Sequence, residues 1–182
     1  MSQSALIVID MLNRYDHEDA DRLVASVRDV TPVLAGLVRD ASEQDGLVVY
    51  VNDNHGDWTA GRSALSRSAL DGEAPELVEP IVPDDETPFL VKARHSAFYA
   101  TQLEYLLREQ EVDRVVLTGQ VTEQCVLYTA LDAYVRGFDV TVPRDAVAHI
   151  HADLADAALR MMEVNMRADV VDAPGALETL SR

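Results

Sequence analysis

Cysteine is nearly absent from this sequence, since Cys125 is the one example among 182 residues. A single cysteine forms no internal disulfide, which agrees with a reducing compartment. No stretch approaches the ~20 uninterrupted apolar residues that a membrane span requires. The first residues also lack the basic start and the long apolar core of a signal peptide. We therefore expect a cytoplasmic location.

Basic residues are also few, because 15 lysines and arginines face 32 aspartates and glutamates, for a formal net charge of −17. Such a surface repels the phosphates of nucleic acids and anionic lipids. We expect neither nucleic acid nor membrane as a partner. Hydrophobic residues make up 48% of the chain, enough for a substantial core, and the length fits one domain over residues 1–182.

Short apolar runs alternate with longer amphipathic segments along most of the chain. The predicted strands occupy residues 5–9, 47–51, 89–91, 114–118, 139–142 and 169–171. The predicted helices occupy residues 21–44, 62–69, 99–110, 123–136 and 153–167. We expect an interruption of the first helix near Thr31-Pro32, where Thr can cap and Pro can start a helix. The alternation predicts an α/β fold with a parallel sheet covered by helices on both faces.

Three residues that could do chemistry together follow predicted strands. Asp10 could move a proton, Lys92 could hold a thiolate by its charge, and Cys125 could be a nucleophile. Cys125 lies one turn into a predicted helix with Thr122 as N-cap, and the helix start should lower the thiol pKa. Each residue has a plainer interpretation: a capping aspartate, a solvated lysine, a buried structural cysteine. Since ligands bind beyond the carboxyl ends of parallel strands, their common edge favours a joint role.

Three segments around these residues resemble motifs of the isochorismatase-like cysteine hydrolases. Residues 8–15 are similar to the first-strand motif, residues 89–98 to the lysine motif, and residues 117–126 to the nucleophile motif. The departures from the commonest first-strand form are at Leu12, Arg14 and Tyr15. With the alternating pattern, the resemblance predicts a three-layer, Rossmann-like domain. Its six-stranded parallel sheet should have the first strand at its centre.

The resemblance also implies a catalytic triad of Asp10, Lys92 and Cys125. It implies a cis peptide bond between Gln120 and Val121, which would aim the backbone amides of Val121 and Cys125 at one point as an oxyanion hole. Relatives that hydrolyse the vinyl ether of isochorismate typically lack the nucleophilic cysteine. The resemblance therefore favours a hydrolase of a small amide, carbamoyl or related C–N compound, acting through a thioester intermediate.

Two other functions stay open at this point. The chain could be an isochorismatase-type vinyl-ether hydrolase, or a binding or scaffold protein that has kept the fold but not turnover. In each case we expect a homo-oligomer, a dimer or larger, because parallel α/β enzymes of this size commonly form symmetric assemblies.

Substrate contacts are expected from the loops that surround this edge of the sheet. The candidates are Tyr15, Asn52, Asn54, Trp58 and Phe98. Each again has an alternative role, since the asparagines could form a turn, Trp58 could anchor its loop, and Phe98 could be helix packing.

A metal site is the last feature to weigh. Asp53-Asn54-His55 resembles part of the Asp-x-His metal site of nicotinamidases, which needs a further histidine before the lysine. The histidines that precede Lys92 are His17 and His55, so the set is incomplete. We predict neither a metal nor a cofactor.

Overall fold

Seven strands form one sheet in the computed structural model, which describes residues 3–180. The strands are β1 (Gln3–Ile9), β2 (Leu47–Asp53), β3 (Phe89–Lys92), β4 (Val112–Gln120), β5 (Asp139–Pro143), β6 (Val147–Ala148) and β7 (Asp169–Val171). Six of them follow the order β3-β2-β1-β4-β5-β7, while the short β6 pairs with the end of β4. The strand pairings are parallel. The six predicted strands and the central place of the first are confirmed, and β6 is an addition.

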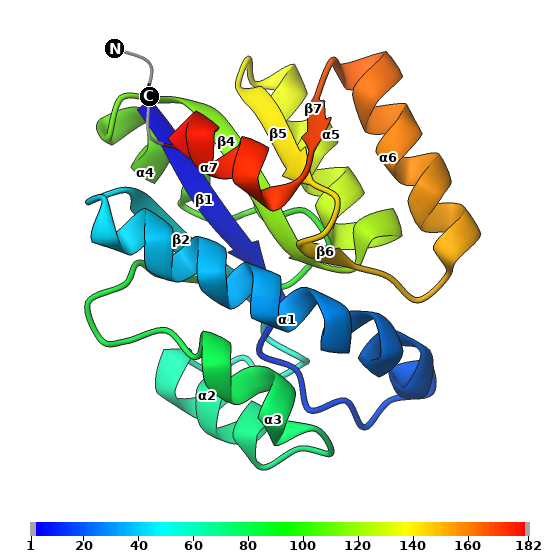
Figure 1. Ribbon diagram of the computed structural model, residues 1–182. Helices are drawn as coiled ribbons and strands as arrows, with labels where there is room; N and C mark the ends of the chain where they lie inside the picture. Colours follow the sequence, from blue (N-terminus) through cyan, green and yellow to red (C-terminus); the bar gives the residue numbers. More distant parts are fainter. Residues whose placement is uncertain (1–2, 181–182) are drawn as a thin grey trace.

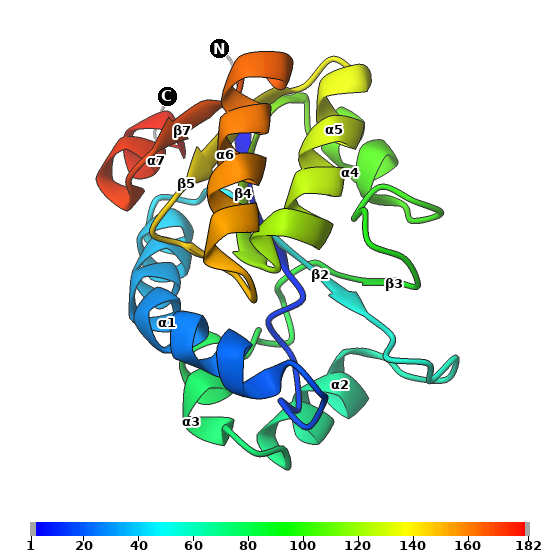
Figure 2. The same cartoon turned by 90° about the vertical axis from the view of Figure 1, so that its right-hand side faces the viewer.

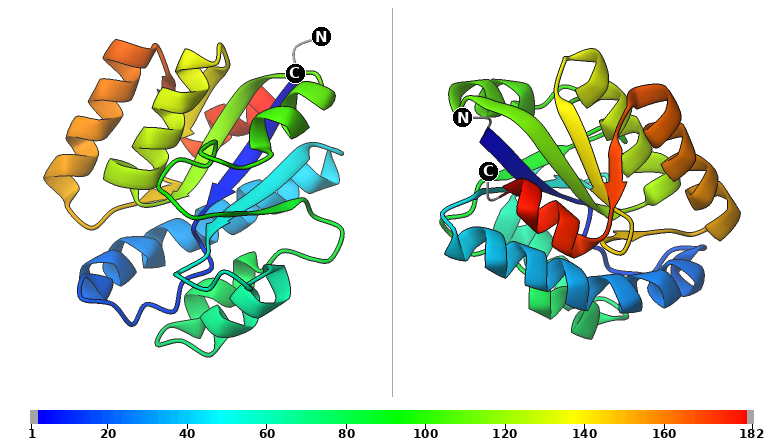
Figure 3. Two further views of the ribbon diagram at one scale, coloured as in Figure 1. Left: turned by 180° about the vertical axis from the view of Figure 1, so that it is seen from behind. Right: turned by 45° about the horizontal axis from the view of Figure 1, so that its top comes forward.

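Helices cover both faces of this sheet, which gives the predicted three layers (Figures 1 and 3). The α-helices are α1 (Ala20–Glu43), α2 (Arg62–Leu70), α3 (Pro75–Val78), α4 (Leu103–Glu109), α5 (Leu127–Val135), α6 (Ala152–Met166) and α7 (Ala173–Leu180). α1 and α7 lie on one face, and α4, α5 and α6 lie on the other, where Figure 2 shows α5 and α6 side by side. Within residues 3–180, no helix is long and apolar enough to cross a membrane.

β1 is apolar at successive positions because both of its faces are buried. Leu6 and Val8 pack into the core beneath α1, whereas Ala5, Ile7 and Ile9 pack into the core on the opposite face. Alternate side chains of a strand point to opposite faces, so a central strand needs apolar residues at every position. The apolar run ends at Asp10, where β1 reaches the edge of the sheet.

The expected interruption of the first helix is wrong, because α1 runs through Pro32 without a break. The hydroxyl of Thr31 does not cap a helix but donates to the carbonyl of Leu77 at 3.2 Å. A proline inside a helix costs about 3 kcal/mol through the lost hydrogen bond and the ring clash. The buried stripe of α1, which includes Leu23, Val27 and Leu34, offsets that cost with about 1.5–3 kcal/mol for each large side chain.

Two further helices differ from prediction in their starting points. α4 begins at Leu103 rather than at residue 99, because the Thr101 hydroxyl donates to the carbonyl of Ala97 and accepts the amide of Leu103. A side chain that bonds nearby backbone competes with helix formation in this way. The segment expected as one helix from residue 123 starts instead as a π-helical turn, η2 (Thr122–Val126), before α5. α3 and α7 were not predicted.

Gly119, at the end of β4, is the glycine on which this edge of the sheet depends most. Its φ of +103° is strained for other residues, and a Cβ there would collide with the backbone of Ile9 in β1. We expect Gly119→Ala to lower the free energy of unfolding by about 3 kcal/mol or more. Urea denaturation measures this, and a loss below about 1 kcal/mol would contradict it.

Gly36→Ala is the matched control, because Gly36 lies inside α1 with nothing nearer to its added Cβ than Arg39 Nη2 at 3.9 Å. It should stabilise the protein by about 0.5–1 kcal/mol through better helix propensity.

Candidate active site

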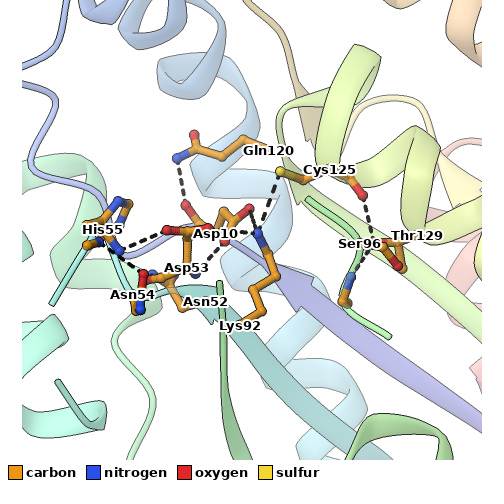
Figure 4. A network of polar contacts seen from close by, with 12 residues as sticks. Asp10, Asn52, Asp53, Asn54, His55, Lys92, Ser96, Gln120, Cys125 and Thr129 are labelled. Carbon is orange, nitrogen blue, oxygen red and sulfur yellow. Dashed lines mark hydrogen bonds and ion pairs between the residues drawn. The ribbon is translucent and has the colours of Figure 1, made fainter. Parts of the chain in front are cut away.

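The three residues of the predicted triad meet at the carboxyl edge of the sheet. Asp10 directly follows β1, Lys92 is the last residue of β3, and Cys125 lies in η2, just after β4. β4 is a direct neighbour of β1, but β2 separates β3 from β1. Only a long side chain at the end of β3 can therefore reach the space above β1 (Figure 4).

Lys92, the one lysine in the sequence, is buried with its whole side chain at 0% exposure. Its Nζ lies 2.8 Å from Asp10 Oδ2, 3.5 Å from Asp53 Oδ2 and 3.7 Å from Cys125 Sγ. An ammonium group has three protons and no acceptor site. All three protons thus have a partner, and the group joins Asp10, Asp53 and Cys125.

The charge of Lys92 is kept by its neighbours. Burial alone lowers a lysine pKa, but the charge and hydrogen bond of Asp10, together with Cys125 and Asp53, outweigh it, so the pKa of Lys92 is raised. Asp53 lies directly beside Lys92 in the pairing of β2 with β3. A second carboxylate is thus built into the sheet next to the ammonium group.

Asp10 is held by backbone contacts as well as by Lys92. Its Oδ1 accepts the amide of Asp53 at 2.7 Å, and its carbonyl accepts Nε2 of Gln120 at 2.7 Å. Burial raises the pKa of Asp10, while Lys92 and the hydrogen bonds partly oppose the shift. The carboxylate is therefore a stronger base than an exposed aspartate, fixed in one position.

The thiol of Cys125 behaves differently from the sequence prediction. Burial, and then the charge of Asp10, raise its pKa to about 12, although Lys92 acts in the opposite direction. The expected lowering by a helix start is thus wrong for the free protein. The proposed cap is wrong too, because the hydroxyl of Thr122 donates to the carbonyl of Ala148 at 2.8 Å. At neutral pH the resting site holds a protonated thiol beside a lysine–aspartate ion pair.

A small polar pit of about 140 Å³ opens onto these groups. Its lining residues are Asp10, Asn13, Asp53, His55, Gln120, Val121 and Cys125. Val121 and Cys125, the two predicted oxyanion-hole residues, therefore face the same space as Asp10. The peptide bond between Gln120 and Val121 is cis.

None of the five predicted substrate-binding residues lines the pit, and Tyr15, Asn52 and Phe98 among them are buried. Tyr15 is buried, and its hydroxyl donates to Gln120 Oε1 at 3.3 Å. Asn52 is buried and ties the loop after β1 to β2, because its side chain accepts the amide of Leu12 and donates to the carbonyl of the same residue. Phe98 packs in the core on Phe138, with ring centroids 5.7 Å apart. These positions are those of supporting residues.

Asn54 and Trp58, the other two, line a neighbouring cavity of about 450 Å³. Asp53 and His55 line the pit while Asn54, between them, lines the cavity. Successive residues of this loop thus line different hollows. The Trp58 ring is 84% exposed, so it does not anchor its loop to the core.

The Asp53 and His55 pair is not part of a larger ligand set. Across residues 3–180, no group of three or more histidine, cysteine, aspartate or glutamate side chains is arranged to hold a metal ion. The Asp53 carboxylate accepts the amide of His55 at 2.8 Å and pairs with Lys92, while Nε2 of His55 lies 3.0 Å from the carbonyl of Leu12. Both side chains are engaged in organising the pit.

Sequence reasoning missed Asn13 and Gln120 as residues of the pit. Asn13 follows β1 by a few residues, and Gln120 is the last residue of β4. The rule that pointed to Asp10 and Cys125, the carboxyl ends of parallel strands, applies equally to both. Which amide side chains at this edge face the pit depends on contacts between distant segments, so the sequence did not separate Asn13 and Gln120 from Asn52 and Asn54.

Comparisons with known proteins show the family to which this fold belongs. The family model described as the isochorismatase domain matches residues 4–174. An uncharacterized isochorismatase family protein, YaaI of Bacillus subtilis, is 30% identical over 97% of this chain and 98% of its own length. Maleamate amidohydrolase of Pseudomonas putida is 30% identical over 97% of this chain and 86% of its own. The crystal structure of N-carbamoylsarcosine amidase from Thermoplasma acidophilum superposes with a TM-score of 0.73 at 28% identity, over 94% of this chain and 96% of that one.

The charge arrangement predicts how Cys125 reacts with iodoacetamide. At pH 8 alkylation should be slower than that of a free cysteine peptide, because a pKa of about 12 leaves little thiolate. Asp10→Asn should speed it about tenfold or more, since it removes a charge that raises the thiol pKa, and Lys92→Met should slow it. Mass spectrometry measures the rate and should show alkylation of Cys125. The exposed Tyr105→Phe should leave the rate unchanged, and a wild-type rate equal to that of the free peptide would contradict the high pKa.

Proposed function

The chain belongs to the isochorismatase family of hydrolases, and we propose that it is a cysteine hydrolase that cleaves the C–N bond of a small amide or carbamoyl compound through a thioester. The observation that carries the proposal is the contact of one buried ammonium group with both Asp10 and Cys125. An acid and a nucleophile that line one small pit, joined by a buried cation, are the parts that acyl transfer from nitrogen needs. The names of two relatives, maleamate amidohydrolase and N-carbamoylsarcosine amidase, support the same class of reaction.

In the first half-reaction, Asp10 takes the proton of the thiol as Sγ attacks the carbonyl carbon. The high pKa of Cys125 means that proton transfer accompanies attack instead of preceding it. Lys92 stabilises the sulfur as charge develops, since its Nζ is already 3.7 Å away. The new C–S bond forms, the C–N bond breaks, and the proton on Asp10 leaves with the amine.

The developing oxyanion needs donors that are in place before the reaction. We assign this role to the backbone amides of Val121 and Cys125, and the support is that both residues line the pit with Asp10. Preorganised donors of this kind lower a barrier by about 3 kcal/mol each.

In the second half-reaction, water replaces the departed amine. Asp10 removes a proton from the water as it attacks the thioester, and the thiol regains a proton when the C–S bond breaks. The products are a carboxylic acid, or a carbamate from a carbamoyl compound, and the enzyme returns to its resting state.

The test is ammonia release from a panel of small amides and ureido compounds, including maleamate. Cys125→Ser should lower turnover by about a thousandfold or more, because a hydroxyl is far less acidic than a thiol. Asp10→Asn should be nearly as severe, since it removes the proton carrier. The double variant should lose little more than either single one, because the residues act as a unit.

Tyr105→Phe, on the exposed side of α4, serves as the activity control. Mass spectrometry of the quenched reaction should show the acyl group on Cys125. Turnover that survives Cys125→Ser, or hydrolysis of an enol ether in place of amides, would point away from thioester chemistry.

We also propose that the chain self-associates, as parallel α/β enzymes of this size commonly do. The net charge of −17 opposes association through repulsion, so the sedimentation coefficient should rise with salt at fixed protein concentration. Sedimentation velocity at micromolar concentration should give a dimer or a larger species. A monomer at all salt concentrations is the opposing result.

A further inference from the structure

The hydrogen bonds of the pit identify which polar atoms remain for a substrate. Each carboxylate oxygen of Asp10 and Asp53 already has a partner within residues 3–180. Gln120 is engaged at both ends, since one N–H of Nε2 donates to the carbonyl of Asp10 and Oε1 accepts the hydroxyl of Tyr15. These contacts hold the three side chains in place, whereas Asn13 and His55 each keep an atom with no hydrogen-bond partner within residues 3–180.

Asn13 offers the pit a hydrogen-bond donor. Its Oδ1 accepts the backbone amide of Tyr15 at 2.7 Å. A backbone amide only donates, so this contact fixes which end of the side-chain amide is oxygen. The NH₂ group of Asn13 is therefore directed elsewhere, and within residues 3–180 it makes no hydrogen bond.

His55 offers an acceptor. Its Nε2 lies 3.0 Å from the carbonyl oxygen of Leu12, which only accepts, so Nε2 carries the proton. In the neutral ring, Nδ1 is then an acceptor, and no other residue of the described part of the chain hydrogen-bonds to it. His55 lines the same pit as Asp10 and Cys125, and Asp10 lies between the other two in the view of Figure 4. This arrangement favours a contact of His55 with a part of the substrate other than the bond that is cleaved.

The net charge around the pit favours some ligands over others that could bind Asn13 Nδ2 and His55 Nδ1. Two carboxylates, Asp10 and Asp53, face one ammonium group, Lys92, so the triad region carries a net negative charge. A substrate carboxylate would be repelled by this charge, and it would bring a second acceptor to Nδ1 of His55. A neutral group with one acceptor and one N–H donor satisfies both Asn13 and His55.

We propose that Asn13 Nδ2 and His55 Nδ1 bind a second carboxamide or ureido group of the substrate, so that the preferred substrates are small diamides or ureido amides. This inference rests on the proposed amide hydrolysis and adds its substrate class. It predicts that a diamide is preferred to a half-acid such as maleamate.

Three matched compounds test the proposal: butanediamide, its half-acid, and 4-methylpentanamide, in which an isopropyl group replaces the second carboxamide. The same three kinds of compound built on propanediamide cover a shorter spacing between the two carbonyl groups. The kcat/KM for the diamide should exceed that of both other compounds by about tenfold or more, the effect of one to two hydrogen bonds.

Variants at His55 test the Nδ1 acceptor without straining the backbone, because asparagine and glycine tolerate the φ of +48° at this position. His55→Gly should reduce the ratio of diamide to hydrocarbon analogue about tenfold, whereas His55→Asn, with an oxygen near the place of Nδ1, should keep most of it. Asn13→Asp keeps the oxygen that accepts Tyr15 but removes the donor, and should lower the ratio too. His17→Asn, outside the pit, is the control and should leave it unchanged.

Calorimetry of the same compounds with the Cys125→Ser variant distinguishes failure of this inference from failure of the proposed function. Amide turnover without a diamide preference, or with a half-acid preference, overturns the inference and leaves the proposed function standing. A diamide preference in binding that His55→Gly removes, without turnover by the wild type, supports the subsite and overturns the proposed function. Equal binding of all three compounds without turnover overturns both.

Discussion

The burial of one charged lysine is the constraint on which this site depends. Removing an ammonium group from water costs several kcal/mol, and only close opposite charges with good hydrogen bonds repay it. Lys92 is repaid by Asp10 at 2.8 Å and by Asp53 at 3.5 Å, which come from the ends of two neighbouring strands. A buried, charged Lys92 needs close partners, and this requirement keeps Asp10 and Cys125 within reach of its Nζ. Stability and reactivity therefore have a common physical origin here.

In this arrangement the negative charge lies on Asp10, paired with Lys92, and not on the sulfur of Cys125. With the Cys125 pKa at about 12, the negative charge rests on Asp10, where Lys92 and the Asp53 amide stabilise it. In the mechanism we propose, Sγ bonds to a carbonyl carbon in the pit, and the negative charge moves from the Asp10 carboxylate to the oxyanion. That mechanism needs no permanently reactive thiolate, but it requires Asp10 and Cys125 to act in one step.

The surrounding polar residues show how a parallel sheet turns its edge into a selective pit. Gln120 links the end of β4 to the backbone of Asp10, and Asn52 links β2 to the loop after β1. These contacts hold the backbone around Asp10 in place. Asn13 and His55, which each keep an atom with no hydrogen-bond partner within residues 3–180, stand on loops and so can differ without disturbing the sheet.

The alternation of apolar runs and amphipathic segments determined the six main strands, the parallel sheet and the edge at which Asp10, Lys92 and Cys125 fall. Local pattern carries this information because strand and helix periods are properties of short segments. Tertiary structure decided the rest. α1 passes through Pro32 because packing outweighs a local preference. The thiol pKa is high because burial and a carboxylate from another strand outweigh the helix start. Tyr15 and Phe98 are buried in packing positions, while Asn13 and Gln120 line the pit, because neighbours from distant segments determine which side chains face the open space.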